Sequence, residues 1–127
     1  MKPSYLFEID VPRSYVRMTL NGFFSPEQVA EFDVARHAAY RELRCARNQH
    51  VTLVDMRGMD IQPQEAVAMF GQSLADPRTR SRRLAFVVAK SLSRLQIQRA
   101  AAGRAPAYFT TIEDAEAFLF CADIQAA

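Results

Sequence analysis

The residues best placed to do chemistry follow a short apolar run in the middle of the chain. His50 to Asp60 reads HVTLVDMRGMD, and Asp55 is the first charge after the apolar run. Asp55 and Asp60 could act as a general acid and base if a loop brought them together. Several polar residues follow at once. We predict a partner- or ligand-binding site formed by Asp55, Arg57, Gly58, Asp60, Gln62 and Gln64.

A structural role explains Asp55 better than a catalytic one. An Asp at the end of a strand often accepts hydrogen bonds from nearby backbone N–H groups and so caps a turn. The sequence contains no P-loop, GxGxxG, GxSxG or HExxH motif and only 4 glycines. His37 and His50 are interpreted as surface or structural histidines. We therefore expect a protein that is not an enzyme, with no catalytic residue, no metal and no cofactor.

Length and composition indicate one globular domain. The chain has 127 residues, of which 50% are hydrophobic and 24% charged, so we predict a single domain over residues 1–127. Cys45 and Cys121 do not form a CxxC pair and are expected to be unpaired thiols. No apolar run reaches the length of a membrane span, and acidic residues come too early for a signal peptide. We expect a cytoplasmic protein.

Basic residues are concentrated in the second half of the chain. The net charge is only +2, yet no acidic residue lies between Asp76 and Glu113. The cluster Arg78, Arg80, Arg82 and Arg83 is a candidate surface for an anionic partner. The simpler alternative, which we favour, is a solvated face balanced by nearby acids. Nucleic acid is not an expected partner, because no aromatic residues alternate with the arginines to stack on bases.

Alternating side chains predict two strands at the start of the chain. They cover Ser4 to Asp10 and Tyr15 to Leu20, and the short connection between them predicts an antiparallel hairpin. Ser25, Pro26 and Gln28 form a capping box, which predicts a helix to about Ala46. The apolar run from Val51 predicts a buried strand, followed by a turn that contains Arg57, Gly58 and Asp60.

The second half of the chain continues the alternation of helices and strands. We predict a helix from Pro63 to Asp76, a strand over Leu84 to Ala89, and a third helix from Ser91 or Ser93 to Gly103. A short strand over Ala107 to Phe109 precedes a final helix, for which Thr110 and Glu113 form a capping box. The order ββαβαβαβα predicts an α/β fold with a mixed, mostly parallel five-stranded sheet and helices mainly on one face.

Three stretches carry a family resemblance. They are NGFFSPEQVAEF, VTLVDMRGMDI and YFTTIEDAEAFL. With the element order, they resemble the STAS-type anti-sigma-factor antagonists, and more closely the small bacterial STAS-like proteins related to the CRAL-TRIO lipid carriers. This resemblance implies a non-catalytic regulatory role. In the antagonists a Ser at the start of the helix after the third strand is phosphorylated. The matching segment here, MRGMDIQPQ, has no Ser or Thr, so we expect no phospho-serine switch.

Two functions are consistent with these observations. The first is a protein-interaction module that binds a partner through the loop Arg57 to Gln64 and the helix Glu65 to Leu74. The alternative is a carrier of a lipid or small anionic molecule, motivated by 9 Phe, 5 Met and the basic stretch. Core packing explains the Phe and Met residues equally well. A homodimer would cover the side of the sheet that the helices leave open.

Overall fold

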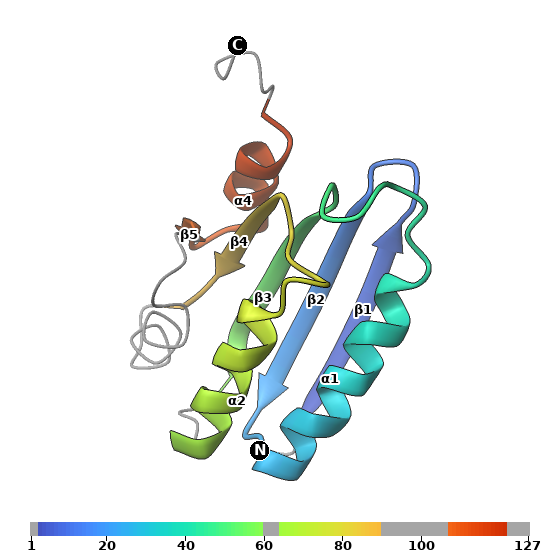
Figure 1. Cartoon of the computed structure of the whole chain (residues 1–127). Helices are drawn as coiled ribbons and strands as arrows, with labels where there is room; N and C mark the ends of the chain where they lie inside the picture. The colour runs from blue at the N-terminus through green and yellow to red at the C-terminus, as the bar shows by residue number, and fades with distance from the viewer. Residues whose placement is uncertain (1–2, 60–63, 90–106, 122–127) are drawn as a thin grey trace.

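The structure is a computed structural model that describes residues 3–59, 64–89 and 107–121. Its elements are β1 (Ser4–Asp10), β2 (Tyr15–Gly22), α1 (Pro26–Tyr40), β3 (Val51–Met59), α2 (Gln64–Ala75), β4 (Arg83–Val87), β5 (Ala107–Phe109) and α4 (Ile112–Leu119). The strands form one sheet in the order β1-β2-β3-β4-β5, in which only β1 runs antiparallel to its neighbour (Figure 1). The predicted α/β class, element order and five-stranded mixed sheet are confirmed. The third predicted helix lies outside the described residues.

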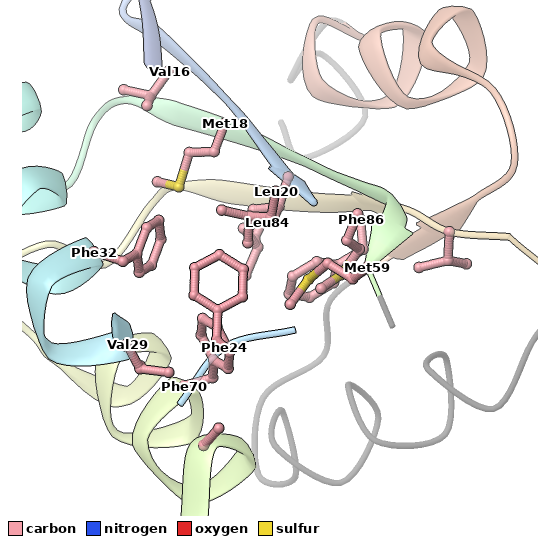
Figure 2. Close-up of a cluster of buried hydrophobic side chains, with 14 residues drawn as sticks. Val16, Met18, Leu20, Phe24, Val29, Phe32, Met59, Phe70, Leu84 and Phe86 are labelled. Carbon is pink, nitrogen blue, oxygen red and sulfur yellow. The ribbon is translucent and has the colours of Figure 1, made fainter. Parts of the chain in front are cut away.

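The sheet separates two apolar clusters of different size. The larger cluster lies between the sheet and the helices α1 and α2, where Phe24, Phe32 and Phe70 meet Met18 and Phe86 (Figure 2). The smaller cluster lies on the opposite face, where Ala115 and Leu119 of α4 pack on the sheet; its strand residues are Tyr15, Val51, Leu53, Ala85 and Val87. Successive strand residues point to opposite faces, so β4, which is apolar from Leu84 to Val87, contributes to both clusters.

Helix α1 ends six residues earlier than the sequence predicts. Ser25 and Gln28 do form the predicted capping box, but the helix stops at Tyr40 rather than near Ala46. A helix of 15 residues is about 22 Å long, which nearly matches the roughly 23 Å of the 7-residue strand β1 that it contacts. A longer helix would overshoot the sheet. Asn48, with φ 64, then redirects the chain toward β3.

The predicted turn at Arg57 and Gly58 is wrong, because both residues belong to β3. The strand continues to Met59 beside an equally extended β2, and the register between them shifts after Thr19. Gly58 fits there because it has no side chain: a Cβ atom would collide with the Oδ1 atom of Asn21. The absence of a Cβ therefore leaves room for the Asn21 side chain beside β3.

The remaining boundaries differ from the prediction by one to two residues. β4 begins at Arg83 and ends at Val87, whereas the predicted strand ran to Ala89. The N-cap of α4 is Thr111 rather than Thr110, since the Thr111 hydroxyl accepts a hydrogen bond from the backbone N–H of Asp114 at 3.2 Å. Two adjacent threonines offer the same capping chemistry, and the sequence pattern does not distinguish them.

Candidate functional site

A fork of hydrogen bonds joins Asp55 and Arg57 near the carboxyl end of β3. The Nε and Nη2 atoms of Arg57 donate to Oδ1 and Oδ2 of Asp55, each at 2.9 Å. The backbone N–H of Arg57 also donates to Oδ1 at 3.2 Å. Asp55 thus accepts the expected backbone hydrogen bond, but it does so within a strand and caps no turn. The carboxylate holds the guanidinium in one orientation at the end of the central strand.

The fork combines a nearly buried anion with a half-exposed cation. The Asp55 side chain is 10% exposed and that of Arg57 is 46% exposed. Partial burial pushes the pKa of Asp55 upward, but the hydrogen bonds from Arg57 outweigh it, so the pKa lies below its ordinary value. The same hydrogen bond raises the pKa of Arg57. Asp55 is thus held ionised, which suits an anchor for Arg57 and not a general acid at neutral pH.

The predicted site residues do not all meet at one place. Asp55 and Arg57 follow Leu53 at intervals of two residues in β3, so their side chains point to the same face of the sheet as Leu53, which is the face that α4 covers. The charge of Glu113 in α4 also raises the pKa of Arg57. Gln64 is exposed at the start of α2, which covers the other face. Gly58 lies in β3 beside Asn21. Asp60 and Gln62 lie outside the described residues, so their place in the predicted site is untested.

The four arginines of the predicted anionic-partner patch make separate local contacts. Arg78 forms a fork with Asp76, at 3.1 and 3.0 Å. Arg82 donates to the carbonyl of Gln49 at 3.4 Å, and Arg83 donates to the carbonyl of Phe118 at 2.8 Å. Arg80 is exposed, and its carbonyl accepts from Asn48. Three of the four guanidinium groups therefore have protein partners among the described residues.

Sequence reasoning missed a polar network between α1 and α2. Arg36, only 6% exposed, donates to Asp33 at 3.0 Å and to the Thr79 hydroxyl at 2.9 Å. Ser73 of α2 donates to the same Asp33 carboxylate at 2.8 Å. His37 lies 3.5 Å from Asp33 and from Asp76. The signal was present in the spacing of residues 33, 36 and 37, which places three polar side chains on one helix face beside the apolar stripe.

A small cavity lies between α1, α2 and the sheet. It measures about 50 Å³, and its lining mixes apolar side chains such as Phe32 and Phe70 with Arg36, Tyr40 and Ser81. A cavity that holds benzene is about 150 Å³, so this one has no room for an acyl chain. Among the described residues, none of Arg78, Arg80, Arg82 and Arg83 lines it, and Arg36 is already paired with Asp33. The structure thus gives the lipid-carrier alternative no support.

The described residues contain neither a cluster of metal ligands nor a membrane-spanning helix. No group of three or more His, Cys, Asp or Glu side chains is arranged to hold a metal ion. None of the described helices is long and apolar enough to cross a membrane. Ion pairs are the main electrostatic features of the site. Among them, the Asp55–Arg57 fork is the one whose two residues both belong to the central strand β3.

Comparison with known structures places the fold in one class. An uncharacterized protein of the DUF3478 family with a SpoIIAA-like fold, from Shewanella loihica PV-4, superposes with a TM-score of 0.70 at 15% identity, over 94% of this chain and 96% of that chain. An anti-sigma factor antagonist from Mycobacterium paratuberculosis gives 0.68 at 11% identity, over 93% and 94%. No family model and no curated protein matches the chain. The chain therefore has a SpoIIAA-like fold of the STAS type, and neither structure bears on the expected CRAL-TRIO relation.

Proposed function

We propose that this protein is a regulatory, non-enzymatic module that binds a protein partner at the carboxyl end of its central strand. The observation that carries the proposal is the Asp55–Arg57 fork, which fixes a half-exposed guanidinium at that end of the sheet. Ligands and partners of open α/β sheets usually bind at the carboxyl ends of the strands. The fold likeness to an anti-sigma factor antagonist supports a regulatory role by analogy.

Exposed side chains of several types surround this end of the sheet. Gln64 and Glu65 are exposed in the first turn of α2. Phe23, which follows β2 directly, exposes 44% of its surface, and β2 and β3 are paired up to Gly22 and Met59. Aromatic and Arg side chains are the residues that most often dominate the binding energy of protein interfaces. A partner surface with an acidic group for Arg57 and an apolar pocket for Phe23 would fit.

The proposed binding is not controlled by phosphorylation at the start of α2. The segment MRGMDIQPQ that leads into this helix contains no Ser or Thr. A phosphate at a helix N-terminus acts through its charge on a docked partner, and this chain has no hydroxyl there to carry one. Regulation would therefore depend on the amount of partner, or on a modification of the partner itself.

The test begins with chemical cross-linking in the native cells, followed by purification of the tagged chain. The affinity of the captured protein is then measured by calorimetry for the wild type and for Arg57→Glu with Gln64→Glu. The double variant is expected to weaken binding at least tenfold, because truncating or reversing a central charge is costly. Arg44→Glu with Gln49→Glu, which makes the same charge changes in the exposed loop before β3, should change the affinity less than twofold. Equal affinity of both double variants would refute the proposal.

A further inference from the structure

The outer edge of β1 is an unprotected sheet edge. β1 pairs with β2 through seven consecutive residue pairs without a bulge, and no described strand lies on its other side (Figure 1). Proteins usually block such an edge with Pro, Lys, a bulge or a covering segment, since free N–H and C=O groups can pair with another chain. Ser4–Asp10 contains none of these residues, and Ser4, Tyr5, Leu6 and Glu8 are exposed. The only charges on this strand are Glu8 and Asp10.

Two neighbouring apolar side chains are exposed on this edge. Leu6 is 57% exposed and Tyr5 is 39% exposed. Tyr5 belongs to a ring cluster, with its centroid 5.7 Å from that of Phe7 and 5.5 Å from that of Phe32. The edge therefore combines free backbone groups with an accessible apolar surface. An additional strand would pair with the free backbone groups and bury the exposed apolar side chains.

We propose that β1 pairs antiparallel with β1 of a second copy of this chain, with Leu6 on the two-fold axis. This register places Leu6 opposite its own copy on one face of the joined sheet. On the other face it places Tyr5 opposite the partner's Phe7, so that the aromatic cluster continues across the axis. Ser4 faces the partner's Glu8, where a hydroxyl can donate to a carboxylate. The pairing uses Ser4–Glu8, the part of β1 in which four of five residues are exposed.

The neighbouring registers are less favourable. In an antiparallel pair about a two-fold axis, facing residues must point to the same side of the sheet, so the register can change only in steps of two. One step puts Leu6 opposite the partner's Glu8, which sets a charge against an apolar side chain. Two steps put Glu8 opposite its own copy, and like charges directly opposite are destabilising. Both of these registers are therefore less favourable than the one with Leu6 on the axis.

This dimer differs from the one expected from the sequence. The expected dimer covered an open sheet face, but the part of that face beside β1 and β2 carries Glu8, Arg17 and Thr19, which are suited to water. Arg17 Nε lies 3.9 Å from Glu8, so their charges partly compensate. By contrast, the outer edge of β1 has no partner strand among the described residues. The inference does not rest on the proposed function, because it involves neither Arg57 nor Gln64.

Disulfide trapping tests the pairing and its register together. In a background of Cys45→Ser and Cys121→Ser, which removes the two free cysteines, Leu6→Cys should form a covalent dimer under mild oxidation. Paired residues have Cα atoms about 4.5–5.5 Å apart, within the range that a disulfide spans. Glu8→Cys is the matched control. In the proposed register its two copies would be four residues apart along the strands, roughly 14 Å, so it should remain monomeric.

Sedimentation equilibrium supplies an independent measurement. We expect the wild type to dimerise with increasing concentration, Leu6→Lys to weaken the dimer at least tenfold, and Val34→Lys to change it less than twofold. Val34 is a suitable control because it is 72% exposed on α1. A wild type that stays monomeric at millimolar concentration would overturn the inference. A dimer that Leu6→Lys leaves intact, or equal trapping of both cysteine variants, would overturn it as well.

Discussion

Replacing Arg57 by Ala tests whether the fork anchors the site. The change removes two charge-assisted hydrogen bonds of 2.9 Å and leaves Asp55, 10% exposed, without its cation. Such bonds contribute about 1.5–3 kcal/mol when buried, but Arg57 is half exposed, which lowers their value. Asp55 keeps the bond from the backbone N–H of Arg57. We therefore expect the free energy of unfolding at pH 7 to fall by about 1–2 kcal/mol.

The pH dependence gives this prediction a specific signature. In the wild type Arg57 holds the pKa of Asp55 below its ordinary value, so its stabilisation is present above about pH 4 and is lost at lower pH. Without Arg57, the side-chain hydrogen bonds that lower the pKa of Asp55 are lost, so the pKa rises relative to the wild type. The wild type loses the stabilisation by Arg57 as the pH falls through about 4, whereas the variant has none to lose. The deficit of Arg57→Ala should accordingly shrink between pH 7 and pH 3.

Urea denaturation of the wild type and two variants at both pH values is the assay. The matched control is Arg78→Ala, because Arg78 makes the same three hydrogen bonds to Asp76, two residues earlier. Arg78 is much more exposed, and Asp76 keeps His37 at 3.5 Å. The control should therefore lose less than about 0.5 kcal/mol. The reasoning would be refuted by equal losses in the two variants, or by a deficit of Arg57→Ala that is the same at pH 7 and pH 3.

Three further predictions concern the frame that supports the site. Phe32→Ala should lower the free energy of unfolding, measured by urea denaturation, by about 3–5 kcal/mol, because Phe32 is buried among other rings. Phe120→Ala, at an exposed ring, should lower it clearly less. Similar losses in the two variants would contradict the assignment of Phe32 to the core. Ser25→Ala should cost about 0.5–2 kcal/mol, since it removes one side of the capping box, and its circular dichroism should stay native. Acid titration of the urea midpoint should show stability falling between about pH 4 and pH 2, because hydrogen bonds lower the pKa values of Asp33, Asp55 and Asp76 in the folded state, that of Asp76 to about 2; a midpoint that is constant over this range would contradict these interactions.

The fold could be predicted from local patterns because each element carries its own signal. Alternation in β1 and β2, the Ser25 and Gln28 capping box, and the apolar runs of β3 and β4 each identify one element. The ends of the helices and strands were harder to predict from the sequence. The end of α1 depends on the length of the strand beneath it. The continuation of β3 through Gly58 depends on the pairing with Asn21, 37 positions earlier in the chain.

The candidate site was only partly predictable for the same reason. Asp55 and Arg57 are neighbours in sequence, so their interaction could be anticipated from a turn-like pattern. Arg36 of α1 donates to Thr79, and Asp33 accepts from Ser73, over 43 and 40 positions of the chain. Helical spacing marks residues 33, 36 and 37 as one polar face, but no local pattern specifies these distant partners. The open edge of β1 is likewise a property of the strand order. It becomes apparent only when the partners of every strand are known.

The most direct test of the proposed function is an NMR titration of the isotope-labelled protein with its captured partner. The account predicts that the largest amide shift changes cluster at Arg57, Gln64 and Glu65 and at Phe23, while the loop that contains Arg44 and Gln49 changes little. Changes confined to that loop, or to the arginines from Arg78 to Arg83, would place the partner elsewhere. That result would contradict the claim that the carboxyl end of the central strand is the binding site.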